Sequence, residues 1–181
     1  YGVSLQVEDQ REDGTPLDCT FHGSLTSVQE QAFATLLEHD IGVFVAPPGA
    51  GKTVVAIRLI AARGRHTLVL VHRKPLLEQW IARLATFLSL EPKEIGQIGA
   101  GKSKPNGRLD VAMLQSLVRR GEVSDLVAGY GHVIVDEAHH CPAVSFERVL
   151  GEVKARHVLG LTATPQRRDG RHPITTMQLG P

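Results

Sequence analysis

The sequence predicts an α/β fold, in which a mostly parallel β-sheet is flanked by helices in a three-layer sandwich. Short runs rich in valine, isoleucine and leucine alternate along the chain with longer segments whose apolar residues recur at helical spacing. Such runs are typical of strands buried on both faces of a parallel sheet, with helices as the crossover connections. The length of 181 residues and the hydrophobic content of 42% fit one globular domain with a sizeable core.

The strands are expected at six short apolar runs, which are residues 42–46, 67–71, 95–98, 109–113, 132–135 and 157–161. In open parallel sheets, ligands bind beyond the carboxyl ends of the strands. We therefore expect the loop after Ala46, the segment after Val135 and the segment after Leu161 to meet at one edge of the sheet.

The helices are expected between these runs. The stretch S27-V-Q-E30 fits a capping box that starts the first helix, and Pro75 fits the first turn of another, which carries Trp80 on an apolar face. That spacing predicts that Trp80 is a core residue rather than a platform for stacked bases. The same patterns predict helices over 53–62 and 146–153, one or two short helices over 114–126, a loop over 99–107, and a lead-in strand or linker over 1–24.

A glycine-rich stretch, A46-P-P-G-A-G-K-T53, joins the first predicted strand to a predicted helix. Its glycines allow backbone N–H groups to converge on an anion, and the helix presents its positive end to the same place. Lys52 can reach the β- and γ-phosphates of a nucleotide, and the Thr53 hydroxyl can bind Mg²⁺. Ala46 stands where the usual motif has its first glycine. The predicted nucleotide-binding residues of this loop are Pro48, Gly49, Ala50, Gly51, Lys52 and Thr53.

The stretch H132-V-I-V-D-E-A-H139 is an apolar run that ends in two carboxylates. Asp136 can hold the Mg²⁺ that bridges the β- and γ-phosphates, so Thr53 and Asp136 are the predicted metal ligands. Glu137 can orient or deprotonate an attacking water. The predicted catalytic residues are therefore Glu137, Asp136 and Lys52.

Composition excludes several other classes of protein. The formal net charge of +1 gives no global positive field, which leaves only local basic patches for a nucleic-acid partner. Two cysteines, Cys19 and Cys141, favour a reducing compartment such as the cytoplasm over a disulfide-bonded scaffold. Adjacent His139, His140 and Cys141 do not predict a zinc site, because three neighbouring residues rarely converge on one tetrahedral ion. The apolar runs are too short to span a membrane, and no membrane partner is expected.

Three motifs together carry a family resemblance. A-P-P-G-A-G-K-T (46–53), D-E-A-H (136–139) and T-A-T-P (162–165) occur in this order, each after a predicted strand. The chain resembles the first RecA-like lobe of a superfamily 2 helicase or translocase, in the group of excision-repair helicases and restriction-enzyme translocases. The resemblance covers residues 25–171 and implies a helicase ATP-binding domain over 25–181, with ATP and Mg²⁺ as cofactors.

The resemblance also assigns roles outside the phosphate loop. Gln29 is similar to the upstream glutamine that recognises adenine in this family, although T-S-V precedes it here where R-P-Y is more common; a solvent-facing helix residue is the alternative. Thr162 and Thr164 are similar to the motif that couples hydrolysis to movement, through hydrogen bonds that could include His139. Caps at the end of a strand are the alternative for these two threonines.

A nucleic-acid face is implied by two further stretches. V-H-R-K-P-L-L-E-Q-W (71–80) and M-L-Q-S (113–116) resemble motifs that contact the sugar-phosphate backbone, with Arg73, Gln115 and Ser116 as the candidate contacts. Lys102 and Lys104 can add electrostatic affinity or can be solvated surface residues. Arg167 and Arg168, in contrast, could serve nucleic acid or a second lobe.

Proteins of this superfamily close ATP between two lobes, and the second lobe supplies arginine fingers that raise turnover by orders of magnitude. No second lobe follows in this sequence, so we expect one in the same parent chain and very slow hydrolysis by these residues alone. The expected partner is nucleic acid, with DNA favoured over RNA. The alternatives are a P-loop nucleotide-dependent transferase, a restriction-type duplex DNA translocase subunit and a non-catalytic docking module.

Overall fold

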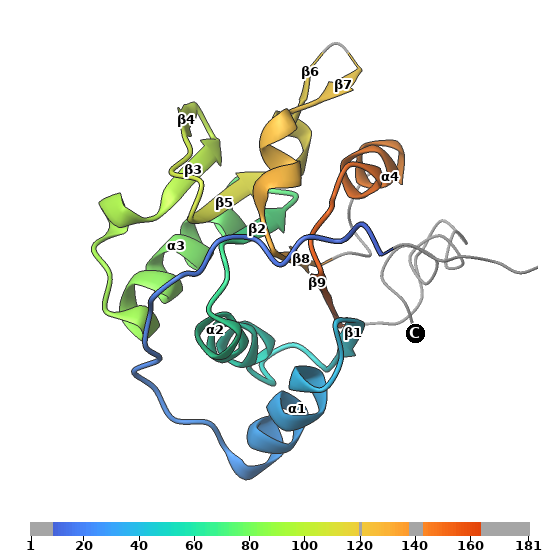
Figure 1. The fold of residues 1–181 in the computed structure, drawn as a ribbon. Helices are drawn as coiled ribbons and strands as arrows, with labels where there is room; N and C mark the ends of the chain where they lie inside the picture. The colour runs from blue at the N-terminus through green and yellow to red at the C-terminus, as the bar shows by residue number, and fades with distance from the viewer. Residues whose placement is uncertain (1–8, 120, 138–142, 164–181) are drawn as a thin grey trace, which may run out of the picture.

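The computed structural model describes residues 9–119, 121–137 and 143–163, and it confirms the predicted α/β fold (Figure 1). A seven-stranded sheet has the order β1-β9-β8-β2-β5-β3-β4, and every neighbouring pair is parallel except β3 and β4. The strands are β1 (Ile41–Val45), β2 (Thr67–Val71), β3 (Gly96–Gly99), β4 (Lys102–Lys104), β5 (Leu109–Met113), β8 (His132–Asp136) and β9 (His157–Thr162). The α-helices are α1 (Ser27–Leu37), α2 (Lys52–Arg63), α3 (Lys74–Leu88) and α4 (Ala143–Gly151).

Alternate residues of the central strands face two separate apolar cores, so the sheet is the middle of three layers. Val69 and Val71 of β2 pack with buried residues of α1, α2 and α3. Leu68 and Leu70 of the same strand pack with α4 and with the segment before β8. Figure 1 shows α1, α2 and α3 on one side of the strands and α4 on the other. Burial on both faces explains the nearly unbroken apolar run of β2 and confirms the predicted layering.

The first helix begins one residue earlier than the capping-box prediction placed it. Thr26 is the N-cap, where its hydroxyl accepts the N–H of Gln29 at 3.3 Å and its own N–H donates to Gln29 Oε1 at 3.0 Å. The predicted pair of Ser27 and Glu30 is therefore wrong. Threonine and glutamine have the same capping chemistry as serine and glutamate, so the sequence pattern does not distinguish the two registers.

Two segments near the far edge of the sheet also differ from the prediction. Residues 102–104, expected in a loop, form β4 antiparallel to β3, because Gly99, Ala100 and Gly101 all have positive φ angles and turn the chain back. The predicted short helices over 114–126 are 3-10 turns, η2 (Leu114–Ser116) and η3 (Asp125–Gly129). A hairpin of β6 (Val118–Arg119) and β7 (Glu122–Val123) lies between these two turns.

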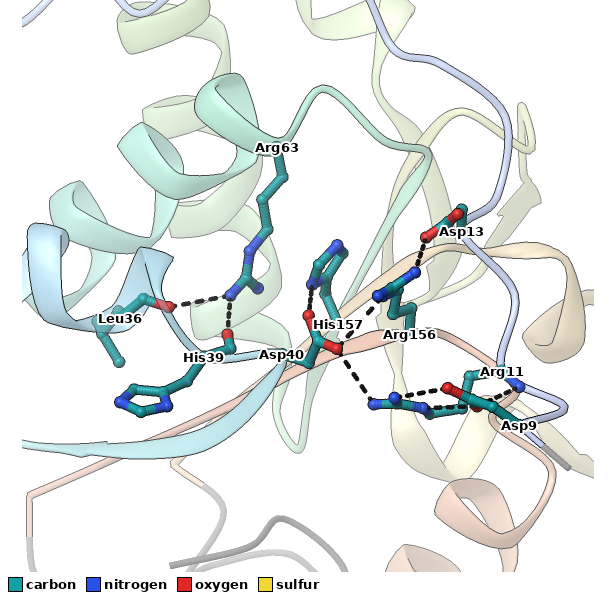
Figure 2. A network of polar contacts seen from close by, with 9 residues as sticks. All are labelled: Asp9, Arg11, Asp13, Leu36, His39, Asp40, Arg63, Arg156 and His157. Carbon is teal, nitrogen blue, oxygen red and sulfur yellow. Dashed lines mark hydrogen bonds and ion pairs between the residues drawn. The ribbon is translucent and has the colours of Figure 1, made fainter. Parts of the chain in front are cut away.

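The described part of the N-terminal segment lies along the domain, as the dark blue trace in Figure 1 shows. Leu17 is buried in the core, and the N–H of His22 donates to Phe87 O at 2.7 Å. Asp40 lies among cations at the amino end of the sheet, within 3.4 Å of Arg11 and 3.2 Å of Arg156 (Figure 2). Residues before α1 thus pack against the lobe, while the predicted domain boundary at residue 24 stays a prediction.

Candidate nucleotide-binding and nucleic-acid-binding site

The sheet topology brings the three sequence motifs to one edge. β9 lies between β1 and β8, with Thr162 paired to Val45 on one side and Leu161 paired to Asp136 on the other. The N–H of Ala46 donates to Thr162 O at 3.1 Å, which extends this parallel pairing into the glycine-rich loop. The loop after β1, the carboxylate that ends β8 and the threonine that ends β9 are therefore neighbours, as the sequence predicted.

The glycine-rich loop contains two residues in left-handed backbone conformations. Gly49 has a φ of +83° and Gly51 a φ of +84°, values that favour glycine because a side chain is strained there. An added Cβ at Gly49 would meet nothing within 4 Å, so the space beside that residue is open. Pro48 is exposed, and the N–H of Ala50 donates to Pro47 O at 3.2 Å to close the turn. α2 begins directly after the loop, so its N-terminal N–H groups and its dipole favour an anion at this position.

Lys52 and Gln29 are both bonded to the loop itself. The ammonium of Lys52 donates to Ala46 O at 2.5 Å and to Pro47 O at 3.1 Å. Lys52 therefore lies against the glycine-rich loop, and a phosphate bound there would have to replace these two carbonyl oxygens as its partner. Gln29 Nε2 donates to Ala50 O at 3.0 Å, while its Oε1 is used by the helix cap. Gln29 therefore contacts the loop rather than facing solvent, and both ends of its amide already have partners.

Asp136 is a buried carboxylate at the end of β8, with only 6% of its surface exposed. Its Oδ2 accepts the indole N–H of Trp80 at 2.7 Å, and its Oδ1 accepts the N–H of Glu137 at 2.9 Å. Burial, the largest effect, raises the pKa of Asp136, and the hydrogen bond from Trp80 and the charge of Lys52 act in the opposite direction. An additional cation at this carboxylate would stabilise its ionised form.

Glu137 has a φ of +49°, an unusual conformation for a residue other than glycine. Such strain tends to occur at functional sites, where the surrounding structure holds it. The carboxylate lies 3.3 Å from Arg73 Nη2 and 3.8 Å from His72 Nε2, and the Glu137 side chain is 29% exposed. Arg73, predicted as a nucleic-acid contact, therefore also contacts the predicted catalytic carboxylate.

The other predicted site residues divide into described and undescribed positions. Thr53 is half-buried in the first turn of α2, and Thr162 is buried at the end of β9. His139 and Thr164 lie outside the described residues, so their predicted coupling role stays a prediction. The same holds for Arg167 and Arg168 and for the stretch of His139, His140 and Cys141. Among the described residues, no group of three His, Cys, Asp or Glu side chains could hold a metal ion.

A groove with a volume of about 820 Å³ lies between the two hairpins at the far edge of the sheet. Its lining includes Gly99, Gly101, Lys102, Gln115 and Ser116. Figure 1 shows the β3–β4 and β6–β7 hairpins projecting from the same side of the sheet. Gln115 Nε2 also donates to His72 O at 3.1 Å, so a residue that lines the groove is hydrogen-bonded to the turn that contains Arg73. Two of the predicted nucleic-acid contacts, Gln115 and Ser116, therefore line this groove, and Gln115 is hydrogen-bonded to the residue that precedes Arg73; their binding role stays a prediction.

Sequence reasoning missed two contacts of the site. The predicted burial of Trp80 is confirmed, but its hydrogen bond to Asp136 was not foreseen. The contact between Arg73 and Glu137 was not foreseen either. A buried tryptophan must place its N–H on an acceptor, which is the one sequence-level signal that could have prompted a search for the first contact.

In the described part of the chain, no helix has the length and hydrophobicity that crossing a bilayer requires.

The glycine-rich loop follows β1, the acidic residues Asp136 and Glu137 lie at the end of β8, and β9, which ends at Thr162, lies between these two strands. This arrangement is that of a RecA-like nucleotide-binding lobe. The family described as "Type III restriction enzyme, res subunit" matches residues 22–167. The chain belongs to this family, and it is a first RecA-like lobe of the superfamily 2 helicase class.

Individual relatives agree with this membership. The chain is 34% identical over 175 residues to "Putative DNA 3'-5' helicase Rad25" of Halobacterium salinarum, covering 94% of this chain and 29% of that protein. It is 33% identical over 178 residues to "DNA 3'-5' translocase XPB2" of Sulfurisphaera tokodaii, covering 98% of this chain and 39% of that protein. The UvsW helicase from bacteriophage T4 has a similar fold, with a TM-score of 0.74, 16% identity, and coverage of 94% of this chain and 67% of the other. The chain thus spans well under half the length of the two curated relatives.

Proposed function

We propose that this lobe binds ATP with Mg²⁺ as part of a nucleic-acid-dependent ATPase, a helicase or DNA translocase. The observation that carries the proposal is the meeting of Lys52, Asp136 and Glu137 at one edge of the sheet, beside an open glycine cradle. An active-site carboxylate pair next to a phosphate cradle is what nucleotide hydrolysis requires. A solvated surface turn would not need a buried Asp136 or a strained Glu137.

The described residues fit Mg²⁺ and ATP in their donor chemistry. Backbone N–H groups of Gly49, Gly51 and Lys52 and the ammonium of Lys52 would hold phosphate oxygens. The Thr53 hydroxyl and the Asp136 carboxylate would hold the metal. When bound, Mg²⁺ would neutralise charge on the phosphates. Glu137 would orient the attacking water and accept its proton. Gln29 would act from beside the loop, with adenine recognition as its proposed role.

Arg73 and the groove lined by Lys102, Gln115 and Ser116 would contact the sugar-phosphate backbone. Lysine, arginine, backbone N–H and amide donors are the groups that most protein–phosphate contacts use. We favour DNA over RNA because both curated relatives described above are named for DNA. Because Arg73 also reaches Glu137, binding of a phosphate there would alter the surroundings of the catalytic carboxylate.

A second RecA-like lobe would complete the site. The two curated relatives described above are much longer than this chain, which covers 29% of one and 39% of the other. We therefore propose that the 181 residues alone bind ATP but turn it over very slowly, without translocation, and that the parent protein acts in the cytoplasm. Strong nucleic-acid-stimulated turnover by these residues alone would contradict this part of the proposal.

The experiment uses a parent chain that continues past residue 181 into the expected second lobe. ATP turnover is measured with and without DNA or RNA for the parent chain, for Glu137→Gln and for Glu152→Gln, a matched change at an exposed residue directly after α4. We expect nucleic-acid-stimulated turnover that Glu137→Gln abolishes while ATP binding is retained, and that Glu152→Gln leaves unchanged.

Other outcomes would favour the alternatives. Turnover that is indifferent to every nucleic acid would favour a nucleotide-dependent transferase. Stimulation by intact duplex without strand separation would favour a restriction-type duplex translocase. Undetectable ATP binding in the parent chain would favour a docking module.

A further inference from the structure

The indole of Trp80 is fully buried and hydrogen-bonded to the carboxylate that we assign to the metal site. Its Nε1–H donates to Asp136 Oδ2 at 2.7 Å. Trp80 lies in the apolar core that α3 shares with α2 and one face of the sheet. Packing of that core therefore fixes the position of the indole, and the hydrogen bond from the indole in turn restrains the Asp136 carboxylate.

The second oxygen of the same carboxylate is held as well. Asp136 Oδ1 accepts the backbone N–H of Glu137 at 2.9 Å. One donor on each oxygen restricts rotation of the carboxylate, while each oxygen keeps a further lone pair with which to bind a cation. Hydrogen bonds of this kind, made to a metal ligand by a neighbouring residue, orient the ligand and tune metal affinity.

We propose that Trp80 is a positioning residue that fixes Asp136 for Mg²⁺ binding, an inference that rests on the proposed nucleotide-binding function. A phenylalanine at this position could fill the same core but would leave Asp136 Oδ2 without its donor. Trp80 lies on the helix whose N-cap is Arg73. The helix that begins at the proposed nucleic-acid contact therefore also holds the proposed metal ligand.

Trp80 is the only tryptophan in the chain, so the indole is also a built-in reporter of this carboxylate. A cation that binds Asp136 changes the electric field at the indole. We expect Mg²⁺ with ATP to change the tryptophan emission of the unsubstituted chain. Asp136→Asn should change the emission without ligand and should remove the response to Mg²⁺.

The main test compares Trp80→Phe with Tyr130→Phe in the 181-residue chain. Tyr130 is also buried, and its hydroxyl donates to a buried carboxylate, that of Asp110, on the opposite face of the sheet and away from the loop. Both variants thus lose one buried donor to a carboxylate, but only Trp80→Phe loses it at the proposed metal site. The affinity for ATP is measured by calorimetry in EDTA and across a series of Mg²⁺ concentrations, with thermal unfolding as the check on folding.

We expect Trp80→Phe to bind ATP in EDTA as the unsubstituted chain does, and to need about 10- to 100-fold more Mg²⁺ for half-maximal enhancement of binding. Tyr130→Phe should show the unsubstituted Mg²⁺ requirement. An unchanged Mg²⁺ requirement in Trp80→Phe would overturn the proposal, as would a tryptophan emission that ignores both Mg²⁺–ATP and Asp136→Asn. The emission test needs no change at Trp80, so it can still overturn the proposed role of Trp80 where Trp80→Phe does not fold. Absence of ATP binding by the unsubstituted chain, in EDTA and in Mg²⁺ alike, would instead contradict the proposed function.

Discussion

Lowering the pH from 7.5 to 5.5 is expected to destabilise the folded chain through one buried histidine, His132. Its Nε2 lies 3.0 Å from Arg63 Nη1, and its Nδ1 lies 3.5 Å from Thr67 Oγ1. A guanidinium can only donate, so Nε2 must accept and the ring proton must be on Nδ1. Burial, the largest cause, and the charges of Arg63 and His157 lower the pKa of His132 well below its ordinary value.

The sign and size of the effect follow from proton linkage. In the unfolded chain, His132 has the ordinary histidine pKa and takes up a proton below a pH of about 6.5. In the folded chain its pKa is lower, so at a pH between these two pKa values it stays neutral. Stability is therefore fully present above that pH and is lost as the pH falls towards the folded pKa. For one such group, the free energy of unfolding drops by about 1.4 kcal/mol between pH 7.5 and 5.5.

The assay is urea unfolding at both pH values for the unsubstituted chain, His132→Gln and His39→Gln. The amide oxygen of the first variant can still accept from Arg63 but does not titrate, and His39 is exposed. When the pH falls from 7.5 to 5.5, we expect the free energy of unfolding to drop by about 1.4 kcal/mol more in the unsubstituted chain and in His39→Gln than in His132→Gln. This corresponds to a difference of about 0.5 to 1 M in how far the urea midpoint shifts. Equal losses in all three proteins would refute the reasoning.

Three further predictions concern the loop, the core and the nucleic-acid face. Gly51→Ala is expected to weaken ATP binding at least about tenfold in a calorimetric titration, because the φ of Gly51 is +84° and the added Cβ would lie 2.3 Å from Gln29 Nε2. Gly49→Ala should have a smaller effect in the same titration, because Gly49 has a similar φ but open space beside it. Phe146→Ala, at a buried position of α4, should lower the urea-derived free energy of unfolding by about 3–5 kcal/mol, and a loss under 1 kcal/mol would contradict the described packing. Arg73→Ala in the parent chain should weaken DNA binding and reduce the salt slope by about 1, with ATP affinity retained; an unchanged slope would remove Arg73 from the nucleic-acid face.

The proximity of the glycine-rich loop and the acidic pair at one edge of the sheet could be predicted, because each motif is recognised from a short stretch of sequence. Glycines before Lys52 and two acids after an apolar run each define a strand end, and parallel topology then places strand ends at one edge. The one-residue error at the start of α1 and the missed strand β4 have equally local causes. Thr26 and Ser27 are both residue types that cap helices, so the sequence does not single out Thr26. Lys102 to Lys104 are exposed and carry no alternating hydrophobic pattern that would indicate a strand.

Contacts between distant residues could not be predicted in the same way. Trp80 and Asp136 are 56 residues apart, and their hydrogen bond depends on how α3 packs on the sheet. Arg73 and Glu137 are 64 residues apart and meet because β2 and β8 are neighbours, which the strand order alone reveals. Helical and strand periodicity indicates which face is buried but not which buried groups meet.

The measurement that tests the central claim most directly is equilibrium binding of Mg²⁺–ATP to this chain and to Lys52→Ala, with Lys93→Ala as an exposed control. A charge-assisted hydrogen bond to a phosphate is worth about 1.5–3 kcal/mol, or about 10- to 100-fold in affinity. We expect the unsubstituted chain and Lys93→Ala to bind ATP alike, and Lys52→Ala to bind at least about tenfold more weakly. No binding by the unsubstituted chain, or equal binding by Lys52→Ala, would contradict the assignment of this loop as the ATP site.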